Sequence, residues 1–152
     1  MDAVRAEVLS AVRAAVDAAP SLEAALDQTV ASLKAHLPTY TWAGVYLLEG
    51  DTLVLGPYRG KPSPHTRIPL HRGICGAAAS EQQTITVDDV HADPRYLACS
   101  IETRSEIVVP IMRDGIVYGE IDIDSDQPAA FGEADRTLLE AIAAALAGRF
   151  PA

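Results

Sequence analysis

The strongest constraint on the fold is a tight turn, Asp114-Gly115, between two apolar segments. An Asp-Gly pair in that setting is a strong short-range signal of a β-hairpin, because the favoured turn needs a positive φ at both central residues. We therefore predict two antiparallel strands, residues 106–112 and 116–124. The second strand alternates, so Ile121 and Ile123 share one face, while the other face carries the carboxyl groups of Glu120, Asp122 and Asp124.

Three segments show the apolar spacing of amphipathic helices. Residues 2–18 carry a stripe of valine and alanine, and a second helix follows Ser21, which can cap it, and stops before Pro38. A closing helix is expected from about Gly132 to residue 150. Its buried side is predicted to consist of Leu138, Leu139, Ile142, Leu146 and Phe150.

The segment between the helices predicts the rest of a sheet. Residues 41–49 alternate, residues 52–56 return after a turn, and short strands follow at 67–70 and 84–87, with a small Gly- and Ala-rich helix at 73–80 between them. Pro69 limits its strand to an edge. We expect one α+β domain over residues 1–152 with the terminal helices on one sheet face. Its parts are helices in 1–38, the sheet, pocket and loops in 40–125, and the closing helix in 132–150.

Charge and composition exclude several classes of function. The net charge of −9 and the scattered arginines disfavour nucleic acid and anionic membranes as partners. The apolar runs are far too short to span a bilayer, and the first residues lack the basic and apolar regions of a secretory signal. These features predict a protein of the cytoplasm.

The two cysteines are too few for a disulfide framework. Cys75 follows Arg72 at the start of the predicted 73–80 helix, where helix amides and a guanidinium would lower the pKa of a thiol. Cys99 lies in a long polar loop, residues 88–103, where a nucleophile would be accessible. A lone cysteine is more often an inert structural thiol. Neither the cysteines nor the histidines have metal-ligand spacing, so we expect no metal site.

Two further groups of side chains allow more than one interpretation. The carboxyl groups of Glu120, Asp122 and Asp124 could line a pocket or simply face water, as on many antiparallel sheets. Trp42 and Tyr46 share a strand face, where they could be core residues or the aromatic wall of a ligand site.

Taken together and in order, the motifs resemble the free methionine-(R)-sulfoxide reductases, a family built on the GAF domain. The resemblance extends over roughly residues 40–150. It is carried by Trp42-Ala43-Gly44-Val45-Tyr46, Gly60-Lys61-Pro62, Arg67-Ile68-Pro69, Arg72-Gly73-Ile74-Cys75-Gly76, Asp88-Asp89-Val90-His91, Ala98-Cys99, Ser105-Glu106-Ile107 and Ile121-Asp122-Ile123-Asp124-Ser125.

The resemblance implies a fold and a set of roles. The fold is a central antiparallel sheet of about six strands, with helices on one face and a ligand pocket on the other, commonly in a homodimer. The implied substrate is free L-methionine (R)-sulfoxide, with no bound cofactor and a thioredoxin-type thiol as external reductant. Cys99 matches the nucleophile and Cys75 a second family cysteine. Trp42 and Tyr46 match pocket aromatics, while the acidic groups that surround the amino end and the sulfoxide correspond to Glu106, Asp122 and Asp124.

One departure from the family pattern concerns the loop after Gly60-Lys61-Pro62. Family members commonly carry a resolving cysteine there, whereas here residues 60–66 are one residue longer and contain none. Resolution then falls to Cys75 or to an external thiol, or it does not occur. The alternative to an enzyme is a stand-alone GAF domain that binds or senses a small molecule without turnover.

Overall fold

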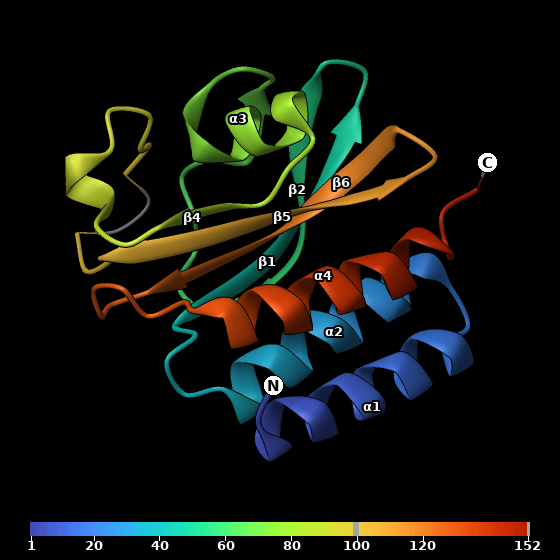
Figure 1. The fold of residues 1–152 in the computed structure, drawn as a ribbon. Coiled ribbons are helices and arrows are strands. Elements are labelled where there is room, and N and C mark those ends of the chain that lie inside the picture. Colours follow the sequence, from blue (N-terminus) through green and yellow to red (C-terminus); the bar gives the residue numbers. More distant parts are fainter. Residues whose placement is uncertain (99–100, 152) are drawn as a thin grey trace.

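The protein is a three-layer structure built on one antiparallel sheet (Figure 1). The computed structural model describes residues 1–98 and 101–151. The helices are α1 (Ala3–Ala18), α2 (Leu22–His36), α3 (Gly73–Glu81) and α4 (Glu133–Ala147), with a short 3-10 turn η1 (Val90–Ala92). The strands are β1 (Trp42–Glu49), β2 (Thr52–Arg59), β3 (Arg67–Pro69), β4 (Ile85–Val87), β5 (Ser105–Arg113) and β6 (Ile116–Ser125). The predicted α+β class is confirmed.

The strand order is β3-β2-β1-β6-β5-β4, which places the first and last long strands side by side at the centre. Each of these strands also pairs with its neighbour in sequence, β1 with β2 and β6 with β5. The predicted turn between β5 and β6 has φ of 54° at Asp114 and 78° at Gly115, as the Asp-Gly signal requires. Pro69 lies on the edge strand β3, as predicted.

One face of the sheet is covered by α2 and α4, and α1 packs across the outer side of these two helices (Figure 1). The inward side chains of the central strands on this face are apolar and almost fully buried: Ala43, Val45, Ile107, Val109, Ile121 and Ile123. Ser21 caps α2 by accepting a hydrogen bond from the N–H of Ala24 at 3.1 Å. Among the described residues, no helix is both long and apolar enough to cross a membrane. This layer is the main core of the protein.

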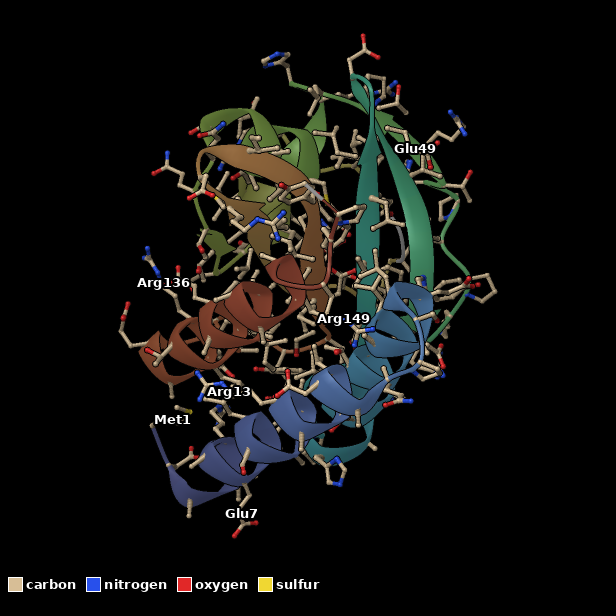
Figure 2. All side chains as sticks on the ribbon, turned by 90° about the vertical axis from the view of Figure 1, so that its right-hand side faces the viewer. Met1, Glu7, Arg13, Glu49, Arg136 and Arg149 are labelled. Atoms are coloured by element: carbon tan, nitrogen blue, oxygen red, sulfur yellow. The ribbon has the colours of Figure 1, made fainter. Side chains whose placement is uncertain are left out.

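Two predicted boundaries were wrong. Strand β2 continues past residue 56 to Arg59, because a bulge in β2 places Gly56 and Pro57 opposite the single residue Val45 of β1. Pairing then resumes at Tyr58, beyond Pro57, which has no N–H to donate. The closing helix ends at Ala147, three residues early. Arg149 then donates hydrogen bonds to carbonyl oxygens at the end of α1, one of them to Ala19 at 3.0 Å, and Figure 2 shows its side chain beside that helix.

A buried polar group joins the helical layer to the start of β1. The Asp135 carboxylate on α4 accepts hydrogen bonds from the Tyr40 hydroxyl at 2.5 Å, from two nitrogens of Arg5 at 2.8 and 3.0 Å, and from the N–H of Gly132 at 2.9 Å. Burial and the Asp135 carboxylate raise the pKa of Tyr40, so its hydroxyl stays protonated and donates. Three elements thus meet at one carboxylate.

We predict that Tyr40→Phe destabilises the protein by about 1–3 kcal/mol, because a hydrogen bond to a buried charged group is lost. The melting temperature should fall by about 2–4 °C for each kcal/mol. The matched control is Tyr118→Phe, whose half-buried hydroxyl accepts a bond from Arg113 at 3.0 Å. Equal decreases in the melting temperature of the two variants, measured by calorimetry, would contradict the prediction that the Tyr40–Asp135 hydrogen bond stabilises the protein more than the Arg113–Tyr118 bond does.

Candidate functional site

The sheet face away from the three helices carries a cluster of acidic side chains. In the β1–β6 pairing, Trp42 lies opposite Asp124, and in the β5–β6 pairing Glu106 also lies opposite Asp124. Residues directly opposite one another in antiparallel strands point to the same face. We call the four carboxyl groups on this face the acidic cluster: Glu106 (4% exposed), Glu120 (0%), Asp122 (2%) and Asp124 (4%). The solvated-face interpretation is therefore wrong, and the pocket interpretation stays a prediction.

Helix α3 covers the acidic cluster. Cys75, the third residue of this helix, is buried, and its thiol donates to Oδ2 of Asp122 at 3.4 Å. Burial, followed by the charges of Asp122, Glu120 and Glu106, raises the pKa of the Cys75 thiol well above its usual value. The predicted lowering of this pKa was wrong, because Arg72 is exposed while three carboxyl groups face the thiol.

Crowding and burial also change the acidity of the carboxyl groups. Burial raises the pKa values of Glu120, Asp122 and Asp124, and the charge of Asp122 adds to the increase at the other two. Hydrogen bonds with Glu106 act in the opposite direction at both aspartates. Carboxyl groups in such a site retain protons at pH values where exposed ones have lost them. The cluster can therefore both donate a proton and hold a cation.

Trp42 and Tyr46 form an aromatic wall beside the acidic cluster. The Trp42 indole lies over Gly44, where a Cβ atom would collide with the ring, and it stacks on Tyr58 with 5.6 Å between ring centroids. Its N–H donates to the carbonyl oxygen of Lys61 at 2.9 Å, and the Tyr46 hydroxyl donates to the carbonyl oxygen of His65 at 2.7 Å. The two aromatic residues therefore anchor the loop of residues 60–66.

The same loop contacts the chain on both sides of Cys99. Nε2 of His65 lies 3.0 Å from the carbonyl oxygen of Ala98, and the Lys61 ammonium pairs with the Glu102 carboxylate at 2.6 Å. Cys99 itself lies outside the described residues, so its predicted position in the site stays a prediction. The loop that lacks the family cysteine thus contacts Ala98 and Glu102.

The cavity at the acidic cluster is small. Its volume is about 20 Å³, room for about one water molecule. It is lined by Tyr46, Ile68, Ile74, Cys75, Leu97, Glu106 and Asp122. A ligand the size of an amino acid therefore needs side chains around the cavity to move. A larger hollow of about 390 Å³ between β5 and α4 includes neither a cysteine nor any member of the acidic cluster.

Three side chains of the site could ligate a metal ion. One ligand atom each from Cys75, Glu106 and Asp122 lies within 4.8 Å of the others, the one such group in the described part of the chain. Sequence spacing missed this group because its members come from α3, β5 and β6. Alternation along β6 grouped Glu120 with Asp122 and Asp124 as carboxyl groups that could line a pocket, but it predicted no site role for Glu120. The contact of Gly44 with the Trp42 indole was not predicted.

Comparisons with known proteins agree with this fold. Residues 21–150 match the model of the GAF domain. The free methionine-R-sulfoxide reductase of Escherichia coli is 41% identical over 126 residues, which cover 83% of this chain and 76% of that protein.

Two solved structures are also similar. A free methionine-R-sulfoxide reductase from Neisseria meningitidis, solved in complex with its substrate, is 40% identical with a TM-score of 0.92, covering 99% of this chain and 91% of that one. A putative GAF sensor protein from Burkholderia vietnamiensis is 38% identical with a TM-score of 0.90, covering 96% and 92%.

We predict that Glu120 makes stability depend on pH. Its folded-state pKa is raised, so unfolding releases a proton, and stability falls as pH rises above the ordinary value of 4.5 and through the folded pKa. Glu120→Gln removes this dependence. The free energy of unfolding of the variant should match that of the parent near pH 4.5. At pH 8 it should be higher, by an amount within the range of about 0.5–3 kcal/mol usual for single substitutions.

The measurement is denaturant unfolding of both proteins at pH 4.5, 6 and 8. The matched control is Glu49→Gln at the exposed far end of β1 (Figure 2), which should change stability equally at each pH. A constant offset between Glu120→Gln and the parent across this range would contradict the prediction.

Proposed function

The chain belongs to the free methionine-R-sulfoxide reductases of the GAF-domain family, and we propose that it reduces the free sulfoxide through the thiol of Cys99. The observation that supports this proposal best is the acidic cluster. A sulfoxide oxygen must be protonated or strongly hydrogen-bonded before a thiolate can attack the sulfur, and buried carboxyl groups that keep their protons supply that acid.

We assign the recognition of the substrate to the two sides of the cavity. The ammonium group of a free amino acid pairs with the ionised members of Glu106, Asp122 and Asp124. The terminal methyl group of the sulfoxide lies against the indole of Trp42, beside Tyr46. Because a methionine within a peptide has no free ammonium group, it cannot make the first of these contacts. The acidic cluster therefore favours the free amino acid.

The chemical step transfers one oxygen atom. The thiolate of Cys99 attacks the sulfoxide sulfur, Asp124 or Glu106 protonates the sulfoxide oxygen, and methionine leaves while Cys99 becomes a sulfenic acid. Burial and the charge of Asp122 raise the pKa of Asp124 well above its ordinary value, which suits it as the donor. The step needs no metal and no bound cofactor.

Recycling needs a second thiol. Cys75 attacks the sulfenic acid of Cys99, a disulfide forms and water leaves, and a thioredoxin-type dithiol then restores both cysteines by exchange. The raised pKa of Cys75 slows this attack, but the carboxylate of Asp122, 3.4 Å away, can accept its proton. An external thiol that reduces the sulfenic acid directly is the other route.

We further propose the cytoplasm as the compartment and a homodimer as the assembly. Cytoplasmic reductants keep thiols in the reduced state that Cys99 and Cys75 need. The proposal of a homodimer is based on family membership alone, and light scattering of the purified protein would test it.

A non-catalytic sensor is the second candidate function. The absence of a cysteine from residues 60–66 favours it, and one similar structure is described as a putative GAF sensor. A sensor would bind its ligand without consuming it, so turnover separates the two functions.

We predict that the parent protein reduces the (R) epimer of free methionine sulfoxide and leaves the (S) epimer unchanged. Cys99→Ser should lower turnover at least about 1,000-fold while it still binds the (R) epimer, because the nucleophile is lost and the acidic cluster is kept. Methionine formation with dithiothreitol and calorimetric binding are the two measurements. Unchanged turnover in Cys99→Ser would remove Cys99 from the mechanism, and no turnover in reduced, folded parent would favour the sensor.

We predict that Cys75→Ser lowers turnover more with thioredoxin than with dithiothreitol. Without Cys75 no internal disulfide can form for thioredoxin to reduce, whereas a small thiol can reach the sulfenic acid directly. The readout is the ratio of the two rates, which we expect to fall about 10-fold or more relative to the parent. An unchanged ratio would assign resolution to an external thiol.

A further inference from the structure

The acidic cluster has more buried carboxyl oxygens than the ion pairs and hydrogen bonds of the described residues satisfy. Glu120, Asp122 and Asp124 take part in none of the ion pairs formed by the described residues. Glu120 is fully buried, and neither of its carboxyl oxygens has a hydrogen-bond partner in the described structure. One oxygen each of Asp122 and Asp124 is in the same state. Groups of this kind need a proton or a bound cation.

The geometry is close to that of a small tetrahedral metal centre. The ligand atoms of Cys75, Glu106 and Asp122 lie within 4.8 Å of one another. Around Zn²⁺, with bonds of about 2.0–2.3 Å, tetrahedral ligands lie roughly 3.3–3.8 Å apart. Small rotations of the three side chains would bring their ligand atoms from the distances in the structure to those of a zinc centre. The adjoining cavity of about 20 Å³ leaves room for a water molecule as the fourth ligand.

We propose that Cys75, Glu106 and Asp122 bind one divalent cation of the zinc class, with the carboxylate of Glu120 beside it. The presence of a thiol excludes the hard cations as preferred occupants, because Ca²⁺ and Mg²⁺ take oxygen ligands in larger number. The ion balances the charges of the Glu106 and Asp122 carboxylates, which lose their protons when they bind it, and it holds Cys75 as a thiolate.

A bound ion would also act on the proposed reaction. It occupies the carboxylates assigned to the substrate ammonium group and the thiol assigned to recycling. Zinc is therefore a competitive inhibitor of sulfoxide binding. This second statement depends on the proposed function, whereas metal binding itself does not.

The first test uses Co²⁺ as a spectroscopic substitute for zinc in Cys99→Ser protein, in which Cys75 is the only thiol. A cobalt–thiolate absorption band in the near ultraviolet and intense visible bands of a tetrahedral centre, both saturating at one ion per chain, are expected. The absence of the thiolate band in folded, reduced protein would overturn the proposal.

The second test is calorimetric titration of metal-free Cys99→Ser protein with Zn²⁺. Adding Cys75→Ala or Glu106→Gln should raise the Kd at least about 100-fold, and adding Glu120→Gln about 10-fold, since it acts from outside the ligand set. The control is Glu49→Gln, a remote exposed glutamate, with no effect. Since a variant can lose binding by misfolding, circular dichroism must first match the parent, and the isosteric glutamine variants decide the outcome. Equal affinity in all variants would overturn the proposal.

Competition distinguishes this proposal from the proposed function. In Cys99→Ser protein, saturating (R)-sulfoxide should raise the apparent Kd of Zn²⁺ about 10-fold or more, and the (S) epimer should raise it less. Zinc binding with no competition would refute the inhibition while leaving the metal site. A cobalt–thiolate band in Cys99→Ser protein, together with no turnover by the reduced and folded parent, would support the metal site and refute the enzyme.

Discussion

The pairing of β1 with β6 is the contact on which the rest of the structure depends. It joins the two hairpins of the sheet and sets which residues share a face. With Trp42 opposite Asp124, the apolar residues Ala43 and Ile123 meet on the helical face and the acidic groups meet on the other. A slip of one residue would place the carboxyl groups of β6 in the main core, so the apolar pattern fixes the acidic cluster as firmly as it fixes the core.

The acidic cluster opposes folding, and in the proposed mechanism it also supplies the acid. Four buried carboxyl groups would repel one another if all were ionised, and burial raises the pKa values of Glu120, Asp122 and Asp124 instead. The helical layer, with its apolar contacts and the Asp135 network, supplies the stability that offsets this strain. A rigid scaffold thus keeps protonated acids next to a thiol, an arrangement that an exposed surface could not maintain.

The fold was largely predictable because its signals are local. The Asp114-Gly115 turn, the Ser21 cap and the alternation around Trp42 depend on neighbours in sequence, and each prediction was confirmed. The errors came from long-range contacts. The pKa of Cys75 depends on the strands beneath α3, and the roles of Gly44 and Glu120 depend on strand register. Short-range patterns carry no information on these contacts. The placement of Cys99 falls outside the described residues and stays a prediction.

The loop of residues 60–66 is held through its backbone. Trp42 and Tyr46 donate to the carbonyl oxygens of Lys61 and His65, groups that every amino acid possesses. The aromatic wall therefore recognises the path of the loop and is indifferent to the side chains at Ser63 and Pro64. Within such a frame, a lineage can lose or regain a redox-active cysteine, or add a residue, while the wall of the pocket stays in place. In the proposed mechanism, the loop is thus a part of the site that can change while the aromatic wall stays in place.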